Sequence, residues 1–168
     1  MTNSYPAWDE WLAGLSEDER AETLALCDRF AAAGADEPHL WARSEISEGI
    51  PQMARFLLLR SLWSEAINQW QQPSSIERIP AAHRLLQAGA DRADITMFAR
   101  VAAFETVLSV ISLLDEGRPP GLDDAALPGW CLQETDNDDN PTGRRVGGLH
   151  ESVLETDPSG NEAEDLWE

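Results

Sequence analysis

The chain has 168 residues, enough for one domain with a true hydrophobic core but too few for two comfortable ones. Leu and Ala together number 42 whereas Ile and Val number 12, so an all-β fold is strongly disfavoured. The net charge is −19, from 31 acidic residues against 12 basic ones. Because binding to nucleic-acid phosphates depends on cationic side chains, direct nucleic-acid binding is not expected.

The segment Ser16–Glu19 has the pattern of a helix N-terminus. A Ser cap and a Glu three residues later can each bond the other's free backbone amide. Leu24, Cys27 and Phe30 follow at helical spacing, and Gly34 is a typical residue to close such a segment. The sequence therefore predicts a first helix here.

A second helix is expected to begin at Pro38, and a third and stronger pattern runs from Pro51 to Trp70. Apolar residues cover more than half of the circumference of this third segment: Met53, Phe56, Leu57, Leu59, Leu62, Trp63, Ala66, Ile67 and Trp70. A helix that is apolar over so wide an arc is typical of the middle of a bundle. We expect Trp41, Trp63 and Trp70 to lie in the core, with a linker at 73–75.

Pro80 and Gly89 bound a further expected helix, and a long one follows from about Asp91 or Asp94 to Glu116. The apolar stripe of the long helix comprises Met97, Phe98, Val101, Phe104, Val107, Leu108, Ile111 and Leu114. We expect this helix to pack against the 51–70 helix. The fold class is therefore predicted as all-α, a compact bundle of about five helices that forms one domain over residues 1–118.

The composition changes after residue 118. The last 50 residues hold 13 acidic residues and two arginines, and they are rich in Gly, Pro and Asp. We expect residues 119–168 to form an irregular acidic C-terminal region. Within it we expect a short β-hairpin in 129–147, a short helix in 149–156 and a mobile tail in 158–168.

A polar site between the two central helices is one candidate for chemistry. Glu105 lies in the middle of the long apolar helix, and Arg55 and Arg60 on the facing helix are its natural partners. A charge drawn toward an apolar core is costly unless it is paired, and such groups are often functional. His150 and Glu151 follow a Gly pair and could close this site as acid–base groups. The alternatives for Glu105 are an ion pair at the edge of the bundle or plain exposure on an uncovered face. The alternative for His150 is a partly exposed histidine that caps the last helix.

The segment Asp136–Asn140 places oxygen ligands at alternate positions, as the start of a calcium loop does. An EF-hand needs Gly at its sixth position and Glu at its twelfth, but those positions hold Pro141 and Gly147. We therefore expect a solvated hairpin loop, with a weak and irregular cation site as the alternative. No metal and no other cofactor is expected, because neither Cys nor His residues have ligand spacing.

Acidic residues mixed with tryptophan near both ends of the chain resemble docking segments, because Trp is enriched among interface anchors. The candidate partner-binding residues are Trp8, Trp11, Glu17, Asp18, Asp136, Asp138, Asp139 and Trp167. The alternative is that the segments at the two ends touch nothing.

The sequence does not open with a basic segment followed by an apolar one, so export by a signal peptide is not expected. The longest apolar run, Val107–Leu114, is far shorter than the roughly 20 residues of a membrane-spanning helix. Cys27 and Cys131 lie far apart in the sequence and form no ligand motif. We therefore expect a cytoplasmic protein that has no membrane partner.

The leading functional hypothesis is a soluble acidic protein-binding module that engages a basic protein partner. Such a module would act as an inhibitor, as an immunity or antitoxin-like protein, or as a regulatory subunit. The alternative is a small enzyme or ligand-binding helical bundle with its polar site between the two central helices. A third interpretation is a subunit of a larger assembly, a homo-oligomer included. The interpretation leans away from an enzyme, because we find no Gly-rich phosphate loop, nucleophile elbow or paired-histidine motif.

Overall fold

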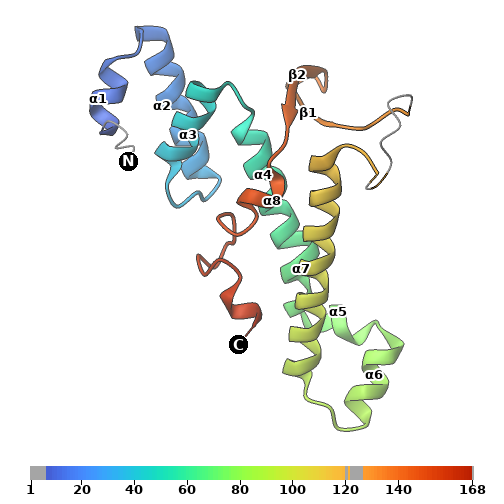
Figure 1. The fold of residues 1–168 in the computed structure, drawn as a ribbon. Helices are drawn as coiled ribbons and strands as arrows, with labels where there is room; N and C mark the ends of the chain where they lie inside the picture. Colours follow the sequence, from blue (N-terminus) through green and yellow to red (C-terminus); the bar gives the residue numbers. More distant parts are fainter. Residues whose placement is uncertain (1–6, 120, 122–126, 168) are drawn as a thin grey trace. The chain divides into compact units, whose positions relative to one another are not determined.

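The computed structural model describes residues 7–119, 121 and 127–167 (Figure 1). The described chain is mostly helical and carries a two-stranded antiparallel sheet near its C-terminus, which confirms the all-α expectation in its broad form. Two compact units, Met1–Ala54 and Arg55–Glu168, divide the chain at a different point from the expected boundary after residue 118. The C-terminal region belongs to the second unit because its buried residues share that unit's core.

The first unit contains the helices α1 (Trp8–Ala13), α2 (Glu17–Ala32) and α3 (Pro38–Glu48). The start of α2 is the expected capping box. The Ser16 hydroxyl accepts a hydrogen bond from the Glu19 backbone N–H at 3.3 Å, and the Glu19 carboxylate accepts one from the Ser16 N–H at 3.0 Å. These bonds satisfy two backbone donors at the start of the helix, neither of which has a backbone partner within the helix.

The core of the first unit lies between α2 and α3. Helix α2 buries Thr23, Leu26 and Phe30 at helical spacing, and the Phe30 ring stacks on that of Trp41 at 5.8 Å. Trp41 is buried, as the sequence predicts. Most other residues of α2 are exposed, so this helix presents its acidic first turn to solvent.

The second unit contains most of one long helical stretch, in which α4 (Gln52–Leu62) continues into a π-helical turn, η1 (Trp63–Ile67), and a 3₁₀ turn, η2 (Asn68–Gln71). The sequence predicts one regular helix from 51 to 70, so its helical character is confirmed and the change of helix type is new. The chain then forms α5 (Pro73–Glu77), α6 (Pro80–Gln87) and α7 (Arg92–Glu116). The prediction of a linker at 73–75 is wrong, because these residues begin α5 and Pro73 occupies its first position.

The core of the second unit lies where α7 packs against η1 and the end of α4, and Figure 1 shows these segments running side by side in opposite directions. Trp63 is completely buried, with its ring 5.6 Å from that of Phe104. The buried cluster consists of Leu59, Trp63, Ile67, Phe104, Val107, Ile111, Leu149, Val153, Ala163 and Leu166. The expected packing of the two central helical segments is therefore confirmed.

The predicted apolar stripe of α7 is only partly buried. Phe98, which the sequence places in that stripe, is 75% exposed. Two apolar residues of α7 outside the stripe, Val110 and Leu113, are exposed as well. Helix α7 is apolar around much of its circumference, so one neighbouring segment cannot cover all of its apolar residues. Trp70, also predicted in the core, is only partly buried.

By length and composition α7 is long and apolar enough to cross a membrane. The longest apolar run in the sequence, Val107–Leu114, did not reveal this property. Single charged residues interrupt a longer stretch whose mean hydropathy is high. Core helices of water-soluble proteins pass the same test. Here α7 contributes Phe104 and Ile111 to the core and buries the charged Arg100. The expected absence of a membrane partner stays a prediction.

The C-terminal hairpin consists of β1 (Leu132–Thr135) and β2 (Pro141–Val146), which pair antiparallel within the expected range of 129–147. Gly117 ends α7 with a φ of +68°, and its carbonyl accepts a hydrogen bond from the Trp130 N–H at 2.9 Å. A Cβ atom on Gly117 would lie 2.8 Å from the Trp130 carbonyl oxygen. Both the backbone conformation and the space therefore require glycine at this position.

The segment after the hairpin packs against the core of the second unit. It contains α8 (Leu149–Ser152), which lies inside the expected range of 149–156, and a 3₁₀ turn, η3 (Glu164–Leu166). Ala163 and Leu166 are buried, so the expected mobile tail in 158–168 instead contributes apolar residues to the core. The last residue of that range, Glu168, lies outside the described residues.

Candidate functional site

The arginines expected in a polar site bind the C-terminal segment. Arg55 donates a hydrogen bond to the Ser152 hydroxyl, and Arg60 donates one to the Thr156 carbonyl at 3.4 Å. Trp63 Nε1 donates to the Val153 carbonyl at 2.7 Å. Three side chains spaced along α4 and η1 thus hold consecutive parts of one segment, which gives Arg55 and Arg60 a structural role.

The structure brings together some of the predicted acid–base groups and separates others. The Arg55 guanidinium and the Glu151 carboxylate both lie beside Gly148. Glu105 is exposed on α7, and it lies ten residues, or about 15 Å of helix, from the Asp115 residue that contacts His150. The five predicted residues therefore do not converge on one polar site.

His150 binds Asp115, a partner that the sequence analysis did not identify. The His150 Nδ1 atom lies 2.6 Å from the Asp115 carboxylate, which also accepts a hydrogen bond from the His150 backbone N–H at 3.0 Å. Burial tends to raise the pKa of Asp115, but hydrogen bonds from the His150 backbone and side chain and from the Leu149 backbone outweigh it. The pKa of Asp115 therefore lies below its ordinary value. This contact fixes the start of α8 to the end of α7.

Replacing His150 by alanine is expected to raise the pKa of Asp115 and to move the acid limit of stability to higher pH. Because the folded pKa is depressed, ionised Asp115 stabilises the fold fully above its unfolded pKa of 3.8, and this stabilisation is lost as pH falls through the folded pKa. The variant loses the side-chain hydrogen bond, so the folded pKa rises toward 3.8 and ionised Asp115 contributes less stability above that pH. NMR titration of the Asp115 carboxyl, with acid unfolding followed by circular dichroism, measures both effects. His83→Ala, at an exposed histidine of α6, is the control. An Asp115 titration that His150→Ala leaves unchanged would contradict this role.

The acidic loop of the hairpin is an internally bonded turn. The Asp136 carboxylate accepts hydrogen bonds from the backbone N–H groups of Asp138 and Asn140, at 2.9 and 3.0 Å. These bonds hold the pKa of Asp136 below its ordinary value, and the bond from the Asn140 backbone has the largest effect. Within residues 7–119, 121 and 127–167 no group of three or more His, Cys, Asp or Glu side chains could hold a metal ion. Asp138 and Asp139 are exposed in this loop.

The N-terminal tryptophans are partly buried. Trp8 and Trp11 stack at 5.4 Å, Trp8 meets the His39 ring edge-on at 5.6 Å, and the Arg43 guanidinium lies 5.2 Å from the Trp11 ring centre. These contacts hold α1 against α3. Of the other predicted partner-binding residues, Glu17 and Asp18 are exposed at the start of α2, and Trp167 is 61% exposed.

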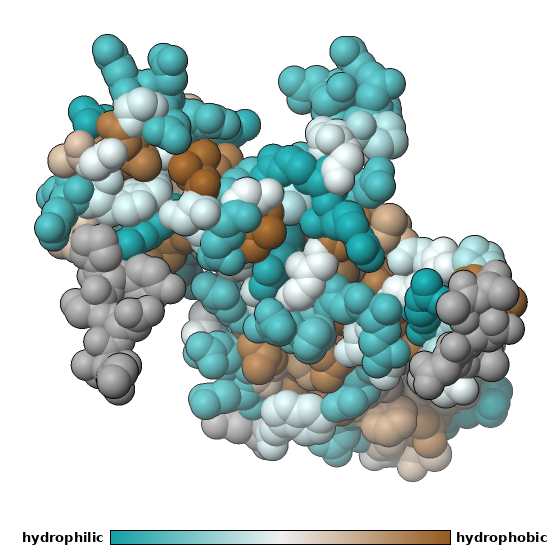
Figure 2. Space-filling view, turned by 45° about the horizontal axis from the view of Figure 1, so that its top comes forward, coloured by the Kyte–Doolittle hydropathy of each residue, from teal (hydrophilic) through white to brown (hydrophobic). Residues whose placement is uncertain are grey.

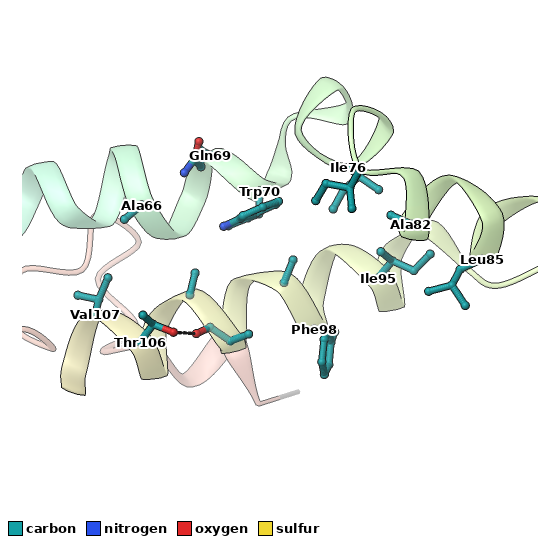
Figure 3. A pocket seen from close by; sticks show the side chains of 14 residues that line it. Ala66, Gln69, Trp70, Ile76, Ala82, Leu85, Ile95, Phe98, Thr106 and Val107 are labelled. Atoms are coloured by element: carbon teal, nitrogen blue, oxygen red, sulfur yellow. Dashed lines mark hydrogen bonds between the residues drawn. The ribbon is translucent and has the colours of Figure 1, made fainter. Parts of the chain in front are cut away.

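The second unit contains an apolar groove of about 560 Å³ that the sequence analysis missed (Figure 3). Helix α7 forms one wall, and η1, η2, α5 and α6 form the other (Figure 3). The lining residues are Ala66, Gln69, Trp70, Ile76, Ile79, Ala82, Leu85, Ile95, Phe98, Ala99, Ala102, Ala103, Thr106 and Val107. Five of the fourteen lining residues are alanines, and larger side chains such as Ile95 and Leu85 lie toward the α6 end (Figure 3).

Helical geometry explains why these residues share a surface. On α7, Phe98 and Ala102 lie one turn apart on the side away from the buried core residues Phe104 and Ile111. In the other wall η1 directs Trp63 and Ile67 into the core, which leaves the intervening Ala66 toward the groove. The groove thus lies mostly on the side of α7 that the core does not cover, and it meets the core at Val107.

The chemistry of the groove favours binding over catalysis. Gln69 and Thr106 are the polar residues among those that line it, and the Thr106 hydroxyl donates to the Ala102 carbonyl at 2.7 Å. None of the described lining residues is a His, Cys, Asp, Glu, Lys or Arg, so the groove holds no acid, base or charged nucleophile. What it offers a ligand is an apolar surface.

A sequence signal for the groove exists but is indirect. The long helix carries more apolar surface than one neighbour can cover, and α6 has a strongly one-sided apolar pattern. Only the folded chain shows that both surfaces meet. Comparisons with known families, curated proteins and solved structures found no match to this chain.

Proposed function

We propose that this protein is an acidic protein-binding module that engages a basic protein partner, in an inhibitory, immunity or antitoxin-like, or regulatory role. The observation that carries the proposal is the net charge of −19 in 168 residues. A charge of this size speeds the encounter with a cationic partner and disfavours wrong partners.

The arrangement of the charges supports the proposal. Some arginines form ion pairs with acidic residues of the same chain. Arg100 pairs with Asp165 at 2.9 Å, and Arg144 pairs with Glu134 at 3.1 Å. Acidic residues such as Glu17 and Asp18, by contrast, are exposed. Figure 2 shows hydrophilic residues over much of one face, with separate apolar patches between them. The surface therefore presents carboxylates in excess to any partner.

The alternative, an enzyme or ligand-binding bundle with a polar site between the central helices, has less support. Arg55 and Arg60 bind the C-terminal segment, and Glu105 is exposed. The groove is apolar and lacks the few convergent polar groups that orient a small molecule. The groove is better matched to a protein surface that carries apolar and cationic groups than to a small molecule.

Salt-dependent capture tests the proposed function. The full chain is immobilised and exposed to its native lysate over a series of salt concentrations, and captured proteins are identified by mass spectrometry. We expect a basic protein whose capture falls steeply as salt rises, because screening weakens the attraction. A variant with Glu17→Gln and Asp18→Asn serves as a matched test of charge at α2. If no protein shows salt-sensitive capture, the proposed function is contradicted.

A further inference from the structure

We infer that the apolar groove of the second unit docks an amphipathic helix of the partner, apolar on the side that enters the groove and rich in Lys or Arg on the other. This inference rests on the proposed function and gives it a binding site. Grooves that receive such helices use apolar anchors at i, i+3, i+4 and i+7, and they leave the polar side of the bound helix in solvent.

The dimensions of the groove match a helix. Along α7 it extends from Ile95 to Val107, which corresponds to about 18 Å or three helical turns. The alanines of the groove lack bulky side chains, so another helix can approach closely along the line of Ala99, Ala102 and Ala103. Phe98 and Leu85 project at one end, where Figure 3 shows them opposite the Ala66 end. A helix lying along the groove would contact both features.

The exposure of the walls favours a large occupant. Phe98 is 75% exposed and Leu85 is 52% exposed, although both line the groove. A small ligand is normally buried by 70–90% or more of its surface, which requires a more enclosed site. A helix would cover these side chains from outside. Patches of this kind on otherwise charged proteins commonly mark interaction surfaces.

Charge complementarity makes a cationic helix the favoured occupant. Residues 55–168 hold 20 acidic residues against nine arginines. A second copy of the chain carries the same −19 charge and is repelled, as is an anionic lipid surface. Close to the groove, exposed Glu65 and Glu105 adjoin Ala66 and Thr106 at one end.

The same charges predict the orientation of the bound helix. Arg84 adjoins Leu85 at the opposite end of the groove from Glu65 and Glu105. The exposed Arg92 nearby pairs with Glu77 at 3.0 Å, and Asp94 precedes Ile95. The acidic excess is therefore at the Ala66 end. We expect the cationic side chains of the partner helix to lie over that end.

Peptide binding to the full chain tests the inference. The probe is a labelled helical peptide of about 14 residues, with Leu on one side and Lys on the other. A peptide of the same pattern with Glu in place of Lys tests charge, and a scrambled Leu/Lys peptide tests amphipathicity. Fluorescence anisotropy measures the affinities. We expect the Leu/Lys peptide to bind most tightly and both other peptides to bind at least about tenfold more weakly.

Two matched variants locate the binding site. Phe98→Glu places a charge in the groove, and Val110→Glu places the same charge at an exposed apolar position of α7 that does not line it. Both are exposed positions, so circular dichroism should show both variants folded. Added negative charge attracts a cationic peptide, so weaker binding cannot come from charge itself. We expect Phe98→Glu to weaken binding about tenfold or more, whereas Val110→Glu should not weaken it.

The possible results separate this inference from the proposed function. Equal affinities of the two variants, or no binding of the Leu/Lys peptide, would overturn the groove as a helix site while salt-sensitive capture could still stand. Binding to zwitterionic or anionic vesicles that Phe98→Glu abolishes would identify a membrane as the occupant instead. A dimer in sedimentation that Phe98→Glu dissociates would identify a second copy. Either result would overturn the inference.

Discussion

Replacing Trp63 by alanine is expected to lower the free energy of unfolding by about 3–5 kcal/mol, the usual cost of truncating a buried aromatic residue. Trp63 has no exposed surface and packs against Phe104 in the centre of the second unit. Its indole N–H also binds the Val153 carbonyl, so the variant loses both packing and a tie to the C-terminal segment. Urea unfolding followed by far-ultraviolet circular dichroism measures the change without relying on the lost fluorophore.

Two further variants separate the contributions at this position. Trp63→Phe keeps an aromatic ring but removes the indole donor, so we expect it to cost less than Trp63→Ala. The Val153 carbonyl still accepts a hydrogen bond from the Thr156 hydroxyl at 3.0 Å, which limits the penalty for the lost donor. Trp167→Ala, at a residue that is 61% exposed, is the control and should change stability little. Equal losses for Trp63→Ala and Trp167→Ala would contradict the assigned core.

Replacing Asp165 by asparagine is expected to destabilise the protein by about 2 kcal/mol, and more than Arg100→Met does. The Arg100 side chain is only 6% exposed. Its guanidinium forms an ion pair with the Asp165 carboxylate and donates a hydrogen bond to the Asn68 side chain, each at 2.9 Å. Asp165→Asn leaves a buried positive charge without its counter-ion. Arg100→Met leaves a carboxylate that is 32% exposed and therefore reached by water, which is why the smaller cost is expected.

The double variant gives the decisive comparison for this pair. Once Arg100 is methionine, Asp165→Asn should cost little, because no buried charge remains to be neutralised. Chemical unfolding of the wild type and the three variants completes the cycle. An Asp165→Asn variant as stable as the wild type would contradict this account. It would mean that water solvates the Arg100 guanidinium well enough to replace its counter-ion.

Local signals in the sequence located most helices. The Ser16 capping box, the start of α3 at Pro38 and the end of α7 at Gly117 depend on hydrogen bonds or backbone conformations that residues close in the chain determine. The hairpin likewise follows from an alternating strand and a turn-rich loop between 132 and 146. These features were predictable because the atoms that decide them are neighbours in sequence.

Features that depend on distant contacts were not predictable in this way. Phe98 and Ile111 look alike in the sequence, yet one is exposed and the other buried, because only one side of α7 meets Trp63. The acid-rich end of the chain has the composition of a mobile tail, but Leu166 reaches the core.

The candidate site shows the same limit. Arg55, Arg60 and Glu105 were chosen because charges stand out on apolar helices, but the arginines bind the C-terminal segment and Glu105 is exposed. The groove depends on α6 returning beside the start of α7, a contact that no local pattern specifies. Its apolar residues look like ordinary core residues until the fold shows them uncovered.

The most direct test of the whole account is an NMR titration of the isotope-labelled full chain with the Leu/Lys peptide. We predict that the amide signals that shift belong to the elements that line the groove, namely η1, η2, α5, α6 and α7 from Ile95 to Val107, with the largest changes around Leu85, Phe98 and Ala102. Shifts confined to the acidic residues of α2 and the hairpin loop, with the groove signals unmoved, would contradict the claim that this protein recognises its partner through the groove.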